Sequence, residues 1–186
     1  KPGAQHTLTA AQPLPLKSVT KDWRSLWQRR LNIAWLPADQ IFLRVIHLPA
    51  ADPAEVLPMV EFQLEKLSPL PVNQIVWSIE PLPQHAENMQ TLVVIIAARS
   101  LIEQFLGRLE NSGYLSDRLE LPCLHQLLVT PVETNGVWIY PNVEYGRTQC
   151  LVAWWYGGVL QQLQLLHLPV TGNQGAVLVE QLTKTA

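Results

Sequence analysis

Apolar and polar positions in the first half of the chain alternate between the period of a strand and the period of a helix. Residues 41–48 are rich in β-branched and aromatic side chains, which predicts a strand. In the following segment the apolar side chains are spaced for one helical face: Val56, Met59, Val60, Leu64 and Leu67. A strand that leads into an amphipathic helix indicates α/β structure.

Local signals mark the ends of this helix. Asp52, Pro53 and Glu55 have the spacing of an N-cap, a first-turn proline and the acid of a capping box. Pro58 lies inside the periodic stretch and lacks a backbone N–H, so we expect either a kink there or a helix that truly begins at that turn.

The pattern continues with further strands and helices. Strands are predicted over residues 33–36, 74–82, 92–97 and 119–121, and the continuous apolar run 92–97 is typical of a buried central strand. Ser100 is expected to cap a helix that Gly113 ends in the left-handed conformation. The buried face of that helix is predicted to hold Leu101, Ile102, Phe105, Leu106 and Leu109. A short helix is expected over residues 122–128.

The last third of the chain predicts a fresh β-β-β-α series. Its strands are expected over residues 137–140, 149–156 and 159–168, and a final helix over residues 175–185. Gly157 and Gly158 form a two-residue hairpin signal between the last two strands. We therefore expect two related halves, residues 21–131 and residues 132–186, of which the second is incomplete. Residues 1–20 are expected to be a flexible tail or linker, and residues 21–31 a short helix.

Composition narrows the classes of function. The 186 residues are 48% hydrophobic and 15% charged, with a net charge of −2 and no basic stripe, which argues against nucleic-acid binding. Two cysteines do not make a disulfide framework, and a reducing cytosol is the default environment. No apolar run reaches the roughly 18 residues that a spanning helix needs, so direct insertion into a membrane is not expected.

Candidate chemistry is sparse. The segment with Glu144, Gly146 and Thr148 resembles a degenerate phosphate-binding loop, although an ordinary β-hairpin is the simpler interpretation. The histidines are not spaced for a metal, and Ser100 is better explained as a helix cap than as a nucleophile. We therefore expect a non-catalytic protein without a cofactor or metal.

Seven tryptophans are many for this length, and two of them are adjacent. Trp154 and Trp155 fall in one predicted strand and must point to opposite faces of the sheet. One interpretation is that the tryptophan that faces away from the main core packs in a second core layer beneath a helix. The other is that it anchors a partner protein, because tryptophan is common among interface hot spots.

Three stretches carry a resemblance to known proteins. They are WLPADQIFLRVIHLP (35–49), MVEFQLEKLSPLPVNQIVWSIEPL (59–82) and VVIIAARSLIEQFLGRLENSGYLSDRLELPCL (93–124). They resemble the cytoplasmic domain of GspL-type proteins of type II secretion systems and the related PilM-like proteins of type IV pilus assembly. The similarity covers roughly residues 32–169 and consists of hydrophobic positions and prolines rather than catalytic residues.

The resemblance implies a ribonuclease H/actin-like fold of the ASKHA type, with mixed sheets and flanking helices. It also implies a non-catalytic cytoplasmic scaffold at the inner membrane, which docks the assembly ATPase and neighbouring platform proteins. Glu61, Glu65, Trp154 and Trp155 are the candidate partner contacts, and a homodimer remains open. The alternative is a nucleotide-binding, PilM-like ATPase domain. Unlike GspL-type proteins, this sequence shows no transmembrane segment.

Overall fold

The computed structural model describes residues 31–38, 41–83, 88–130, 132–144, 147–168 and 173–185. The tail predicted over residues 1–20 and nearly all of the helix predicted over residues 21–31 lie outside these ranges.

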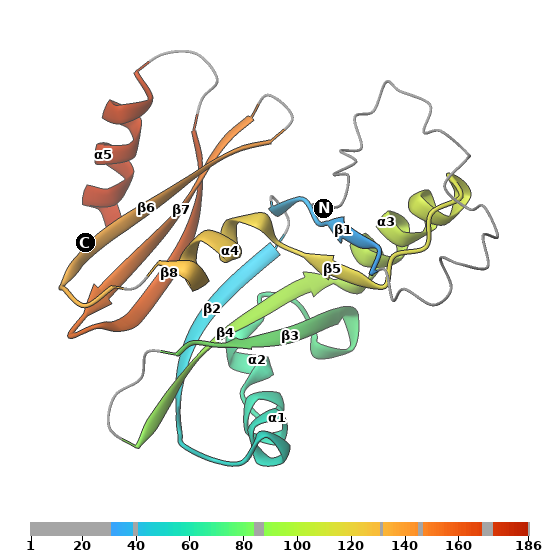
Figure 1. Ribbon diagram of the computed structural model, residues 1–186, viewed down its shortest axis with the longest axis horizontal. Coiled ribbons are helices and arrows are strands. Elements are labelled where there is room, and N and C mark those ends of the chain that lie inside the picture. The colour runs from blue at the N-terminus through green and yellow to red at the C-terminus, as the bar shows by residue number, and fades with distance from the viewer. Residues whose placement is uncertain are drawn as a thin grey trace.

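Three small sheets organise the described part of the chain (Figure 1). In the first sheet two short strands pair in parallel: β1 (Ile33–Trp35) and β5 (Arg118–Glu120). The second sheet is antiparallel and has the order β2 (Ile41–Pro49), β4 (Met89–Ala98), β3 (Ile75–Pro81). The third is an antiparallel meander of β6 (Gly136–Glu144), β7 (Arg147–Tyr156) and β8 (Val159–Leu168). The strands predicted from the sequence are therefore confirmed, with ends shifted by a few residues.

Helices cover the faces of these sheets. The helical elements are α1 (Pro53–Glu61), α2 (Leu64–Leu67), the 3₁₀ turn η3 (Val72–Gln74), α3 (Arg99–Asn111), α4 (Pro122–Val129) and α5 (Gln174–Thr185). With helices between and beside the strands, the molecule is a mixed α/β fold, as the sequence predicts.

The central strand β4 explains why the second sheet needs cover on both sides. Its residues Leu92, Val94 and Ile96 face a core cluster that includes the buried side chains of α1 and α2. The alternate residue Val93 faces the opposite way, into a larger cluster with α3, α4 and the third sheet. All four side chains are almost fully buried, which explains why the sequence of this strand is an unbroken apolar run.

The amphipathic helix predicted over residues 53–67 is divided in two. Val56, Val60 and Leu64 are buried as its spacing predicts, but the α-helical hydrogen bonding stops at Phe62, and the Gln63 N–H donates to the carbonyl of Val60 instead (2.9 Å). Beyond the break, Arg44 of β2 donates from Nε to the carbonyl of Leu67 (3.0 Å) and so satisfies the end of α2.

Two predicted helix caps are wrong in detail. Asp52 is the N-cap of α1, but its side chain makes no capping hydrogen bond, so the capping box with Glu55 does not form. Helix α3 begins at Arg99 with Ala98 as N-cap, which places Ser100 inside the first turn. The register of β4 decides this, because the strand continues to Ala98, opposite Ile75 of β3, and the helix follows without a loop.

The end of α3 agrees with the prediction. Gly113 has φ of 82°, in the left-handed region. Its N–H donates to Glu110 (2.8 Å), and the N–H of Tyr114 donates to Leu109 (2.9 Å), which is the Schellman pattern. The predicted buried face of α3 is correct for Phe105 and Leu109, whereas Leu106 of that face is 37% exposed.

The third sheet contributes to the same core as the second sheet. Inward side chains of the meander, including Tyr140, Leu151, Trp155 and Leu160, belong to one cluster with residues of β2, β4, α3 and α4. The boundary predicted at residues 131/132 therefore falls within a sequence whose two sides share a core, and the division into two actin-like subdomains stays a prediction. The hairpin at Gly157 and Gly158 is confirmed, with φ of 59° and 75°.

Candidate interaction groove

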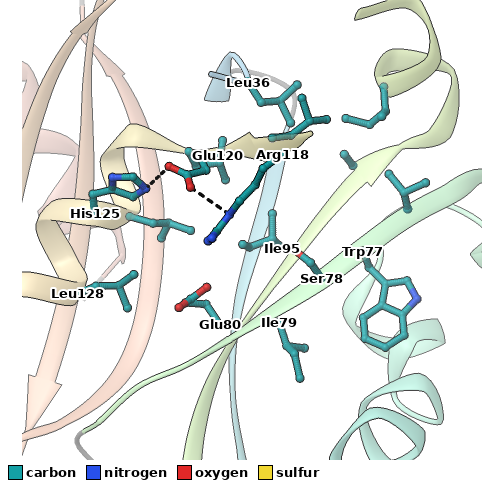
Figure 2. Close-up of a pocket in the computed structure, with 16 residues that line it drawn as sticks. Leu36, Trp77, Ser78, Ile79, Glu80, Ile95, Arg118, Glu120, His125 and Leu128 are labelled. Atoms are coloured by element: carbon teal, nitrogen blue, oxygen red, sulfur yellow. Dashed lines mark ion pairs between the residues drawn. The ribbon is translucent and has the colours of Figure 1, made fainter. Parts of the chain in front are cut away.

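A groove of about 450 Å³ lies between β3 and β4 on one side and β5 and α4 on the other. Figure 2 shows it as an open channel beneath the side chain of Arg118. Its floor is apolar and is contributed by several elements: Leu36, Val76, Ile95, Ala97, Leu124 and Leu128. The groove therefore combines elements that are far apart in the sequence.

The upper rim of the groove holds a carboxylate between two basic side chains. Glu120 accepts from Arg118 Nε (3.0 Å) and lies 2.9 Å from His125 Nε2. The Glu120 side chain is only 11% exposed, whereas its two partners are more than half exposed. Arg118 and Glu120 reach the same side because residues two apart on a strand share a face, and α4 begins just after β5 and brings His125 to them.

The opposite wall carries a second carboxylate. Glu80 lies on the same face of β3 as Val76 and Ser78, and it is partly buried. Figure 2 shows its side chain below Arg118 and directed into the channel. Within the described ranges no ion pair is formed by Glu80, so its negative charge is available to a cationic group that enters the groove.

The edge of the second sheet forms part of the same wall. β3 pairs with β4 alone among the described strands. The N–H of Leu82 donates to the carbonyl of Thr91 (2.9 Å), which fixes the alternation of the ladder. In that alternation the backbone N–H and C=O groups of Trp77 and Ile79 point away from β4. The preceding outward carbonyl, of Ile75, accepts from Arg99 Nη2 (3.0 Å), so the open edge begins at Trp77.

The groove has the chemistry of a binding site. An unpaired strand edge can hydrogen-bond to an extended peptide, and an apolar floor can take every second side chain of that peptide. Ser78 is the one hydroxyl among the lining residues described here, and the contact that His125 Nε2 makes is with Glu120 rather than with Ser78. The nucleophile–base contact that acyl transfer requires is therefore not formed between these two residues. No cluster of three or more metal-ligating side chains occurs among the described residues.

The predicted phosphate loop lies at the β6–β7 hairpin. Glu144 pairs in register with Arg147, and Val143 with Thr148. Gly146 and the side chains of Glu144 and Thr148 lie outside what the structure describes. The backbone around the loop is that of two antiparallel strands, and phosphate binding stays a prediction.

The two adjacent tryptophans point to opposite faces, as predicted. Trp155 is 3% exposed and belongs to the large shared core. Trp154 is partly buried and packs in a separate cluster with Val177, Leu178 and Leu182 of α5. This placement fits the interpretation of a second core layer beneath a helix.

The two acidic candidates, by contrast, are on the surface. Glu61 and Glu65 are both exposed, at the end of α1 and in α2. The groove residues Glu80, Glu120 and His125 were not predicted as a site. The Arg118-x-Glu120 spacing is a usable signal for a polar strand face, but only the tertiary fold brings β3 opposite β5.

Comparisons with known proteins identify the fold. The sequence matches no protein-family model and no curated protein. The structure is similar to a chain of the PilM–PilN type IV pilus biogenesis complex, with a TM-score of 0.58 and 19% identity over 77% of this chain and 44% of that chain. It also matches the cytoplasmic domain of EpsL, an inner membrane component of the type II secretion system of Vibrio cholerae. There the TM-score is 0.46 and the identity 17%, over 77% of this chain and 53% of that chain.

The first likeness confirms, at the level of the fold, the resemblance predicted from the sequence. This chain spans less than half of the length of the pilus protein and about half of the EpsL domain. Separately, none of the helices in the described ranges is both long and apolar enough to cross a bilayer.

Proposed function

We propose that this chain is a non-catalytic docking module of actin-like fold in the inner-membrane assembly platform of a type IV pilus or type II secretion system. It acts on the cytoplasmic side, where it holds the assembly ATPase and neighbouring platform proteins. The observation that carries the proposal is the fold likeness to a chain of the PilM–PilN complex over 77% of this chain.

The groove supplies a place for such a partner. An extended segment that lies along β3 can pair with the outward backbone groups of Trp77 and Ile79, which gives affinity through main-chain hydrogen bonds. Alternate side chains of that segment then enter the apolar floor formed by Val76, Ile95 and Leu124. A lysine, an arginine or a free amino terminus can pair with Glu80.

The test is an affinity capture from the native cell envelope and cytosol with the full chain as bait. A matched pair of variants makes it specific to the groove. Ser78→Arg places a long side chain in the channel, at an exposed position of β3. Ser100→Arg makes the same change at an exposed position of α3 that does not line the groove.

We expect the parent chain and Ser100→Arg to recover pilus or secretion platform proteins, or their ATPase. Ser78→Arg should recover at least roughly tenfold less of the partner that uses the groove, because a blocked pocket removes its anchor contacts. If a folded bait recovers none of these proteins, the proposed function is wrong. The alternative of a nucleotide-binding domain is then tested by titrating the chain with ATP and Mg²⁺.

A further inference from the structure

The outer face of α1 and α2 carries an exposed apolar patch that is separate from the groove. Phe62 is 88% exposed and Leu57 is 49% exposed. Both belong to a row at helical spacing that faces away from the sheet, which we call the outer stripe: Ala54, Leu57, Pro58, Glu61, Phe62 and Glu65. All six of these residues are exposed.

The ring of Phe62 is held outwards by ordered backbone. Its φ and ψ are −61° and −24°, which is helical, and its N–H donates to the carbonyl of Pro58 (3.1 Å). On the other side of the same helices, Val60 and Leu64 are fully buried against the second sheet. Since those two residues fix the rotation of the helices, Phe62 cannot turn into the core without their leaving it.

The charge around this ring is strongly one-sided. The α1–α2 segment with its N-cap contains four carboxylates, Asp52, Glu55, Glu61 and Glu65, against the single ammonium group of Lys66. All of them are exposed. This short segment therefore carries more net negative charge than the whole chain, whose net charge is −2.

We propose that the outer stripe binds a basic amphipathic helix of a partner protein, with Phe62 as the central anchor. Helix α1 has nine residues and rises about 13 Å, which matches two to three turns of a second helix, and the short α2 with Glu65 follows after the break. Phe62, with Pro58 one helical turn before it, contacts the apolar side of that helix. Glu61 and Glu65 pair with lysine or arginine residues that flank it, as charged positions do beside the seam of a coiled coil.

Two physical effects favour the binding of a basic helix at Phe62. A phenylalanine on a fixed helical turn loses little conformational entropy when it is covered, and large aromatic side chains dominate interface energies. The surrounding carboxylates select a basic partner over an acidic one and raise the association rate.

This surface is distinct from the groove. Residues of α1 and α2 pack on the face of the second sheet formed by Leu92, Val94 and Ile96. The groove opens on the other face, at Val76 and Ile95. The inference therefore stands independently of the proposed function.

The experiment measures binding of a defined probe to the full chain by fluorescence anisotropy. The probe is a synthetic amphipathic helix of leucine and lysine with a fluorescent label, and the matched probe replaces every lysine by glutamate. Phe62→Ala is compared with Tyr156→Ala, which removes another exposed ring, 70% exposed, at the end of β7. Circular dichroism confirms that each variant is folded.

We expect the lysine probe to bind at least tenfold more tightly than the glutamate probe. Phe62→Ala should weaken its binding at least roughly tenfold, as loss of a hot-spot ring does. The double change Glu61→Gln and Glu65→Gln should weaken it several-fold and reduce its dependence on salt. Tyr156→Ala and the groove variant Ser78→Arg should bind as the parent does.

Equal binding of the lysine probe by Phe62→Ala and the parent overturns the proposal, because the probe then uses another acidic surface. Equal binding of the two probes overturns the charge selection. Neither outcome bears on the groove, since loss of partner capture by Ser78→Arg is measured separately.

Discussion

At the scale of single residues, two buried polar atoms of the shared core make the structure testable. The Tyr140 hydroxyl and the Trp155 indole nitrogen are buried, and neither has a hydrogen-bond partner in the described part of the chain. Burial raises the pKa of Tyr140, and the polar groups of Thr130 and Trp155 nearby offset only part of this effect. The core therefore keeps a phenol in its neutral form at a cost in desolvation.

Tyr140→Phe should change how stability depends on pH. Because the folded chain holds the pKa of Tyr140 above its unfolded value, the stabilisation is complete below about pH 10 and is lost as the pH rises above it. The variant should lose less stability than the parent as the pH rises above about 10, as measured by urea unfolding. The control is Tyr156→Phe, which alters an exposed ring. The same pH profile for Tyr140→Phe and the parent would contradict the burial of this phenol.

At the scale of single elements, two glycines of one helix should respond in opposite directions to the same substitution. Gly107 lies inside α3, and an added Cβ would meet nothing within 4 Å. Gly113 ends the helix with a positive φ of 82°. Alanine at position 107 should stabilise the chain by about 0.5–1 kcal/mol, and alanine at position 113 should destabilise it by about 1 kcal/mol.

Urea unfolding of the two variants measures these changes, and each variant serves as the control for the other. A loss of stability in both would mean that Gly107 has a neighbour that the structure does not show. A gain in both would mean that the left-handed turn at Gly113 is not formed.

The elements that the sequence predicts well are those with strong local signals. The apolar run of β4, the glycine pair of the β7–β8 hairpin and the glycine end of α3 each follow from a few adjacent residues. The start of α3 and the break after α1 were not predicted, and for α3 the reason is a long-range contact. The pairing of β4 with β3 extends to Ala98 and excludes Ser100 as N-cap. The groove was missed for the same reason, since Glu80 and Glu120 come to line one groove only in the tertiary fold.

At the scale of the whole molecule, the shared core predicts that the second and third sheets unfold together. Leu160 of β8 is fully buried in the cluster that also contains Leu43 of β2 and Val93 of β4. Leu160→Ala should cost about 2–5 kcal/mol because it leaves a cavity. Hydrogen exchange should show a matching loss of protection in β4 and β7, and not in the third sheet alone.

The control for this substitution is Leu115→Ala, at a position that is 71% exposed. It should change protection in neither sheet. Unchanged protection of β4 in Leu160→Ala would show that the two sheets unfold as separate units, which would favour the boundary predicted at residues 131/132.

The two sides of the α1–α2 segment are under different constraints, packing on the buried side and partner binding on the outer side. The buried side, with Val56, Val60 and Leu64, must fit the second sheet, so a substitution there lowers the stability of the fold. On the outer side Phe62 is 88% exposed, so the fold tolerates almost any residue there. Evolution can therefore exchange one binding partner for another on this helix while the architecture stays the same. Across related sequences we expect two rates of change within the α1–α2 segment: a slow rate on the buried side, and a rate set by the partner on the outer side.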